Sequence, residues 1–311
     1  MLNTLILTVN QLINMFSFII IGFIFRKKKI GGEGVATALS SLLVDVFMPA
    51  LVFSTFCENF RISSISENIV FLWYGMGVLL VTFFIAKFLS GKFAENQLQN
   101  DIYMYSFLIP NIGYMGYPLV EAVFGTSAFL KMLIFVIPYN IVIYTYGMYI
   151  LNPRRELSLK RIFCPPIIAL IAGIIAGLAE IKMPAVIDSI ISSAKNCMAP
   201  SAMILTGFVL GKTPIKPLLK DIKLYFAAIT RGILLPGVAL GIMLLLKVPY
   251  QYIVITCVTL AMPMGLNSVV FPEAYGGDGL TGAKTSFVSN LLSIITIPLV
   301  FMVLGYFNVS F

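Results

Sequence analysis

Two short segments combine helix-breaking residues with an asparagine, and together they could bind an anion. The first segment, with two prolines and two glycines, is Ile109-Pro-Asn-Ile-Gly-Tyr-Met-Gly-Tyr-Pro118. The second also combines prolines with a glycine and is Ala261-Met-Pro-Met-Gly-Leu-Asn-Ser-Val-Val-Phe-Pro272. A proline removes a backbone donor and clashes with the preceding turn, so neither segment can continue as a regular helix. The half-helix that follows a break presents unpaired N–H groups and a positive dipole end, which favour an anion. An asparagine adds donors and acceptors without burying a charge.

The candidate ligand-binding residues fall into two groups. Those of the two breaks are Pro110, Asn111, Gly113, Gly116 and Pro118, and then Pro263, Asn267 and Ser268. The second group comprises Asp45 and Lys195, which lie inside apolar runs, where an ionisable side chain is costly unless it is paired or hydrated. Asp45 and Lys195 either form a structural pair or face the path of a ligand. A third internal charge, Arg231, is expected to be structural, either reaching the interface or pairing.

Other kinds of chemistry are absent from the sequence. There is no histidine, and the four cysteines form no C-x-x-C pair, so neither imidazole catalysis nor a typical zinc or redox centre is expected. No G-x-S-x-G, P-loop or H-E-x-x-H motif occurs. We therefore expect no catalytic residue, metal ligand or cofactor. The net charge of +8 is read as evidence on membrane orientation and not as a nucleic-acid-binding surface.

Composition shows which elements must position these residues. The chain is 59% hydrophobic and 11% charged, with a mean hydropathy of +0.98, whereas soluble domains are about 45–50% apolar and 25% charged. The surplus requires a bilayer, and a spanning helix takes about 20 apolar residues. Ten apolar runs lie at roughly 4–25, 35–56, 68–90, 101–125, 128–150, 163–180, 186–211, 222–246, 250–275 and 285–305. The first is expected to be a retained span and not a cleaved signal peptide.

The basic residues orient these spans. Fifteen of the 21 Lys and Arg residues lie in one set of alternate loops and four in the other. Because cytoplasmic loops carry the excess of basic residues, both termini are predicted outside the cell membrane and the central loop inside. The five spans before that loop and the five after it then have opposite orientations in the membrane, as the two halves of an inverted repeat do. The predicted parts are a first repeat at 1–150, a cytoplasmic loop at 151–162 and a second repeat at 163–311.

Several motifs resemble the auxin efflux carrier family. The match rests on the two broken segments, each followed by an aromatic residue and glycine, and the resemblance covers the whole chain. Supporting motifs are Phe47-Met-Pro-Ala-Leu-Val-Phe53, Tyr139-Asn-Ile-Val-Ile-Tyr-Thr-Tyr-Gly147 and Leu291-Leu-Ser-Ile-Ile-Thr-Ile-Pro298-Leu. The short central loop is similar to that of bacterial members.

The resemblance implies an all-helical fold of ten spans, related in architecture to bile acid/sodium symporters. Spans one, two, six and seven would form a scaffold, and spans three to five and eight to ten a moving transport domain in which the broken helices four and nine cross. It also implies an elevator-type carrier of small organic anions such as auxin, malate or malonate, and a homodimer formed through the scaffold. The alternatives are a sodium-coupled symporter, whose ion would need oxygen ligands near the breaks, and a channel or sensor with the same fold.

Overall fold

The computed structural model describes residues 2–32, 34–154 and 164–306, and these are helical apart from their connections. Among these residues, five helical stretches are long and apolar enough to cross a membrane: Gly34–Asn59, Ile65–Phe93, Ile112–Phe135, Ile222–Leu245 and Leu280–Tyr306. Two shorter apolar helices are Pro165–Leu178 and Tyr250–Ala261. The chain is thus an all-helical, multi-pass membrane protein, while ten spans in an inverted repeat remain a prediction. Most of the predicted central loop, from residue 155, lies outside the described residues.

The helices follow the predicted spans closely. Those of the first half are α1 (Leu2–Lys27), α2 (Val35–Leu42), α3 (Met48–Asn59), α4 (Ile62–Asn68), α5 (Val70–Phe93), α6 (Gln97–Leu108), α7 (Tyr117–Phe135), α8 (Ile137–Val142) and α9 (Met148–Ile150). Those of the second half are α11 (Pro165–Leu178), α12 (Ala185–Leu210), α13 (Ile215–Lys220), α14 (Ile222–Ile229), α15 (Leu235–Leu245), α16 (Tyr250–Ala261), α17 (Asn267–Ala274) and α18 (Leu280–Tyr306).

Both predicted helix breaks are present. The first lies between the end of α6 at Leu108 and the turn that begins at Ile112, and the second between α16 and α17. A third interruption falls inside α7 at Gly125, whose φ of 79° and ψ of 175° suit glycine, which has no Cβ. This glycine lies at the predicted boundary between spans four and five.

Three prolines inside the spans follow π-helical turns, whereas Pro200, Pro272 and Pro298 lie within α-helices. The turns η1 (Leu43–Phe47), η2 (Ile112–Gly116) and η4 (Thr230–Leu234) each end two residues before a proline, namely Pro49, Pro118 and Pro236. Proline has no N–H for the usual bond to the fourth preceding carbonyl and clashes with it. In each of these turns the N–H of the residue before the proline donates to the fifth preceding carbonyl, which widens the helix locally. A fourth such turn, η3 (Ile143–Gly147), has no proline after it.

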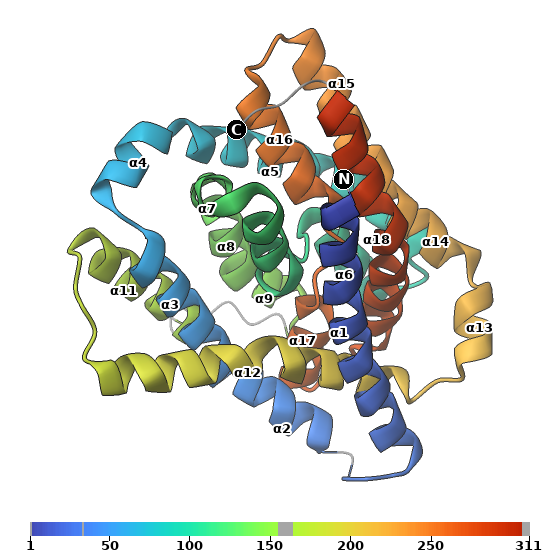
Figure 1. Cartoon of the computed structure of the whole chain (residues 1–311). Coiled ribbons are helices and arrows are strands. Elements are labelled where there is room, and N and C mark those ends of the chain that lie inside the picture. The colour runs from blue at the N-terminus through green and yellow to red at the C-terminus, as the bar shows by residue number, and fades with distance from the viewer. Residues whose placement is uncertain (1, 33, 155–163, 307–311) are drawn as a thin grey trace.

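The helices pack in two groups. In the first, α1 lies on α12, α3 on α11, and α12 also contacts α3. In the second, α5 packs on α6, α7 and α8, while α16 contacts α15, α18 and α7. Figure 1 shows α7 and α8 in the middle of the molecule, with α3 and α11 on one side and α15, α16 and α18 on the other. The groups meet where α17 packs on α2 and α12 and where α18 packs on α1.

The distribution of exposed and buried side chains is the one expected for a protein in a lipid bilayer. Large apolar side chains are exposed on the outside of α5, where Trp73, Phe84 and Phe88 are each more than 60% accessible. In contrast, α18 buries a row of polar side chains that includes Ser286, Asn290 and Ser293. Apolar side chains facing outward suit a hydrocarbon solvent, and the polar groups gather inside, where the two breaks lie.

Candidate functional site

The two broken helices cross, and backbone groups of one break form hydrogen bonds with backbone groups of the other. The Asn111 N–H donates to the Pro263 carbonyl at 2.8 Å, and the Gly265 N–H donates to the Ile109 carbonyl at 3.3 Å. Pro110 and Met264 thereby form an isolated antiparallel bridge between segments that are more than 150 residues apart in sequence. Backbone groups freed by a helix break cannot face lipid. The crossing therefore pairs part of each break with the other.

A small cavity of about 40 Å³ lies beside this crossing. Its walls come from α3, from the first break and α8, and from α12 and the second break. The lining residues are Met48, Leu51, Val52, Thr55, Phe56, Tyr105, Ile109, Pro110, Asn111, Ile112, Gly113, Tyr114, Tyr117, Asn140, Ile143, Tyr144, Met198, Gly265, Leu266 and Asn267. The wall thus joins an apolar lining to a few hydroxyl and amide groups, the mixture typical of small-molecule sites.

Asn111 and Asn267 have different surroundings in this wall. Asn111 is 1% exposed, and neither its amide nitrogen nor its amide oxygen has a hydrogen-bond partner among the described residues. Asn267 is 8% exposed, and its Oδ1 accepts a hydrogen bond of 2.8 Å from the Tyr114 hydroxyl. A buried polar group without a partner costs about 1–3 kcal/mol. Asn111 therefore has an unused donor and an unused acceptor at a cavity wall, as a ligand-binding amide would.

The predicted residues of the breaks divide into lining and supporting positions. Pro110, Asn111, Gly113 and Asn267 line the cavity. The carbonyl of Pro263 accepts the bond from the Asn111 N–H that holds the crossing.

The other three predicted residues also lie off the lining. The Gly116 N–H closes the first turn by donating to the Asn111 carbonyl. Pro118 is exposed after that turn. The Ser268 hydroxyl donates to the Gly265 carbonyl and lies 3.3 Å from the Ser286 hydroxyl, which directs it toward α18.

The structure does not support a pair between Asp45 and Lys195. Lys195 forms its ion pair with Glu58, with Nζ 3.2 Å from Oε1. Asp45 is exposed in η1, thirteen residues before Glu58 along nearly continuous helix, which corresponds to about 20 Å. Lys195 cannot reach both carboxylates, which corrects the structural-pair alternative. Asp45 is also not among the residues that line the cavity.

The surroundings of Arg231 also differ from those expected. It is completely buried in η4, so it does not reach the interface, and none of its guanidinium nitrogens has a hydrogen-bond partner among the described residues. Tyr139 lies close enough for electrostatic interaction with it. A buried cation of this kind is rare in membrane helices and is commonly associated with function.

Several residues of the site were not identified from the sequence as ligand candidates. They are the tyrosines Tyr105, Tyr114, Tyr117 and Tyr144, the amide Asn140, the hydroxyl of Thr55, and Glu58 with Ser54 beside Lys195. The density of tyrosine around the first break was a usable signal. The partner of Lys195 was not, because it lies on a different helix 137 residues away.

Two comparisons with known proteins each cover most of the length of the chain. The model of a family described as "Membrane transport protein" matches residues 7–160 and 155–301. A protein of Methanothermobacter thermautotrophicus, named "Uncharacterized transporter", is 20% identical over 295 residues, which cover 92% of this chain and 95% of that protein.

Proposed function

Because the chain belongs to the membrane transport protein family, the family of the auxin efflux carriers, and is a membrane transporter, we propose that its substrate is a small organic anion. The observation that carries the proposal is Asn111, a buried amide with both polar atoms unpaired at the wall of a cavity beside the helix crossing. Its N–H₂ group can donate to a carboxylate without a permanent charge in the site. The start of the half-helix after Asn111 adds a positive dipole end.

The remaining predicted residues act around this amide. Asn267 orients the Tyr114 hydroxyl within the wall, and the carbonyl of Pro263 fixes the crossing. Gly113 leaves space, since a Cβ there would approach only the Leu51 side chain, at 3.7 Å. Lys195 does not line the cavity and lies in an ion pair with Glu58. Asp45 has no assigned part in binding.

Alternating access would follow from the two packing groups. We assign α1–α3, α11 and α12 to a scaffold, and α5–α9 and α14–α18 to a transport domain that carries the crossing. The cavity supports this assignment because its walls come from both groups, with Leu51, Thr55 and Met198 from the scaffold and Asn111, Asn140 and Asn267 from the transport domain. A substrate held between them would be exposed on one side at a time as the transport domain moves in an elevator-like manner.

The scaffold also offers a surface for a homodimer. Ile168, Ile171 and Ile175 lie along one face of α11 and are 46–58% exposed. Two such faces could pack on each other within the bilayer, where close packing drives helix association. Cross-linking of Ile171→Cys in membranes tests this arrangement. A dimer band is expected for this variant and not for Trp73→Cys on the exposed face of α5.

Counterflow in proteoliposomes tests the function itself. Vesicles with purified protein are loaded with malate, malonate or indole-3-acetate, and uptake of the same labelled anion is measured. A carrier shows faster uptake when unlabelled substrate is present inside, whereas a channel does not. Replacement of sodium by choline tests the sodium-coupled alternative, because a sodium-coupled symporter would lose uptake in choline. If none of the three anions is exchanged, the proposal of an organic anion substrate is wrong.

A further inference from the structure

The cavity wall carries no charged side chain among the described residues that line it, yet an ion pair lies about one helical turn away. Thr55 of α3 and Met198 of α12 both line the cavity. Glu58 follows Thr55 by three residues and Lys195 precedes Met198 by three, which places each on the same face of its helix as the lining residue. One turn corresponds to about 5.4 Å. An anion in the cavity would therefore have this ion pair as its charged neighbour.

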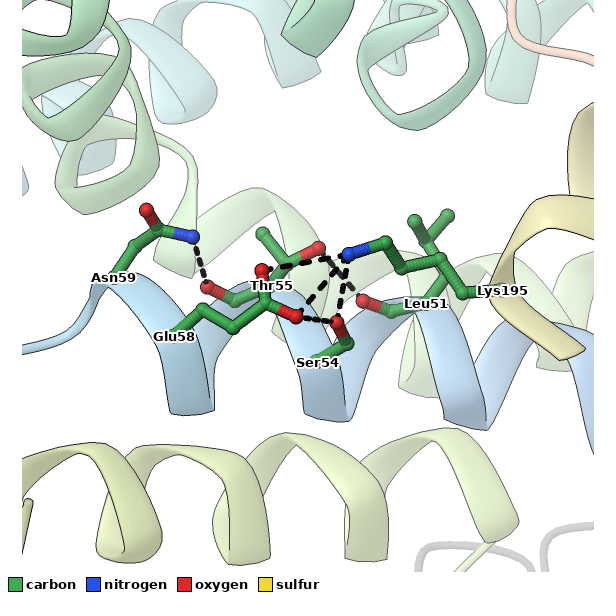
Figure 2. Close-up of polar contacts among 6 residues, drawn as sticks. All are labelled: Leu51, Ser54, Thr55, Glu58, Asn59 and Lys195. Carbon is green, nitrogen blue, oxygen red and sulfur yellow. Dashed lines mark hydrogen bonds and ion pairs between the residues drawn. The ribbon is translucent and has the colours of Figure 1, made fainter. Parts of the chain in front are cut away.

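The Lys195 ammonium group is fully occupied by its present partners. Nζ lies 2.8 Å from Ser54 Oγ, 3.2 Å from Glu58 Oε1 and 3.4 Å from Glu58 Oε2. The Ser54 hydroxyl in turn donates to Oε1 of Glu58, which completes a triangle of contacts between α3 and α12. Figure 2 shows Lys195 reaching from its own helix toward Ser54 and Glu58, with the Thr55 side chain beside them. As it stands, Lys195 offers no net charge to a substrate.

This pair is nevertheless easy to open. The side chains of Lys195 and Glu58 are 27% and 47% exposed, and Glu58 lies just beyond the predicted end of the second span at residue 56. Lysine–carboxylate pairs that are exposed to solvent contribute little to stability, because hydration competes with them. Glu58 is the more exposed partner and can turn away from Lys195 without losing a buried environment. Ser54, which is buried, stays in place as a second acceptor for Lys195.

We propose that Glu58 is the resting counterion of Lys195 and that the carboxylate of the transported anion displaces it. The proposal rests on the organic anion substrate proposed above and assigns to it a carboxylate that exchanges with Glu58. When the site is empty, Lys195 is neutralised and binds no carboxylate. When the substrate enters, one carboxylate takes the position of the Glu58 carboxylate beside Nζ and Ser54, and the rest of the substrate, with the second carboxylate of a dicarboxylate such as malate, extends toward Asn111. Glu58 thereby sets the affinity by competition.

The test compares acids with a neutral analogue in the full-length protein. Indole-3-acetate and malate serve as probes and indole-3-acetamide as the uncharged counterpart, with dissociation constants measured by calorimetry in nanodiscs. Glu58→Gln removes the competing charge and is expected to tighten binding of the acids by up to about fivefold. Lys195→Gln is expected to weaken their binding at least as much, and the double variant to bind as weakly as Lys195→Gln. The amide should respond to none of these changes.

A second ion pair provides the matched control. Lys223 and Glu95 lie 3.3 Å apart with exposed side chains, and neither lines the cavity. Glu95→Gln makes the same change in net charge and should leave acid binding unaltered. If Glu58→Gln does not fold, Glu58→Asp withdraws the carboxylate by one methylene and should also tighten binding.

The outcomes separate this inference from the proposed function. If the unmodified protein binds one of the acids but Glu58→Gln leaves its affinity unchanged or weakens it, the counterion proposal is overturned and the anion substrate stands. The same holds if Lys195→Gln and Glu58→Gln only lower the melting temperature and the double variant restores it, because that is the behaviour of a structural pair. If no acid binds the unmodified protein, both proposals fail.

Discussion

At the scale of single residues, the two asparagines of the crossing illustrate how far the sequence could lead. Their shared position beside a break made both of them candidates, and both line the cavity. The sequence could not distinguish them, because the difference comes from Tyr114, which bonds to Asn267 and leaves Asn111 unpaired. Likewise, Lys195 was identified by its charge, but its partner Glu58 was not. Residue type and local spacing indicate which side chains matter, whereas pairing depends on the packing of distant helices.

This difference predicts opposite effects of two alanine substitutions. Asn111→Ala removes a buried amide without a partner, so the melting temperature should be unchanged or higher while anion binding weakens by about 0.5–1.5 kcal/mol for each lost ligand bond. Asn267→Ala leaves the buried Tyr114 hydroxyl unpaired, which costs about 1–3 kcal/mol of stability. Melting curves and binding isotherms of both variants check this. Equal loss of stability in both would mean that Asn111 has a structural partner.

At the scale of elements, helix contacts depend on glycines whose role is invisible in the sequence. A Cβ on Gly207 of α12 would lie 1.9 Å from the Ile19 carbonyl oxygen of α1, and one on Gly22 would lie 1.9 Å from that of Ile204. Small residues let membrane helices approach backbone to backbone. The breaks, by contrast, were predictable because proline acts locally. The π turns before Pro49 and Pro236 were not, since a kink, a break and a π turn all accommodate the same residue.

Gly207→Ala should therefore separate α1 from α12. The added methyl group must displace backbone atoms, and overpacking of this kind costs about 1–3 kcal/mol. A lower melting temperature and reduced yield in the membrane are expected. Gly241→Ala in α15 is the matched control, because a Cβ there meets nothing within 4 Å and alanine favours the helix. Similar melting temperatures for the two variants would contradict the close approach of α1 and α12.

A second prediction concerns the contact between the proposed scaffold and transport domain. Lys212, next to the end of α12, forms an ion pair of 3.0 Å with Glu273 of α17, which is 4% exposed and also accepts from the Gly279 N–H. An elevator movement must break this pair in each cycle. Glu273→Gln keeps an acceptor for Gly279 but removes the charge, so anion exchange should accelerate, by about fivefold for each kcal/mol that the contact contributes.

Substrate affinity should stay constant in Glu273→Gln, since the residue does not line the cavity. Glu95→Gln serves again as the control, because its pair with Lys223 lies within the proposed transport domain. Counterflow rates and dissociation constants are measured for both. A slower or unchanged rate in Glu273→Gln, with normal folding, would show that this contact does not limit the movement.

At the scale of the whole molecule, hydropathy predicted an all-helical membrane protein and located the helices to within a few residues. It succeeded because the bilayer imposes one constraint on every span. It could not establish how many of these helices cross the membrane. α16 and α17 together occupy the predicted ninth span, yet each is too short to span alone, and only the crossing with the first break makes them one unit. Their joining depends on tertiary packing, which hydropathy does not report.

The orientation of the molecule is the remaining prediction, and it decides the inverted repeat. Fifteen basic residues against four place the central loop in the cytoplasm and the termini outside. In a variant whose natural cysteines are replaced, Arg155→Cys should resist an impermeant maleimide in intact cells, while Asn308→Cys should react. A permeant maleimide must label both, which controls for access. Five predicted spans separate the two positions, and an odd number of crossings puts them on opposite sides. Labelling of both from the same side would require an even number, so the second half could not be the inverted copy of the first.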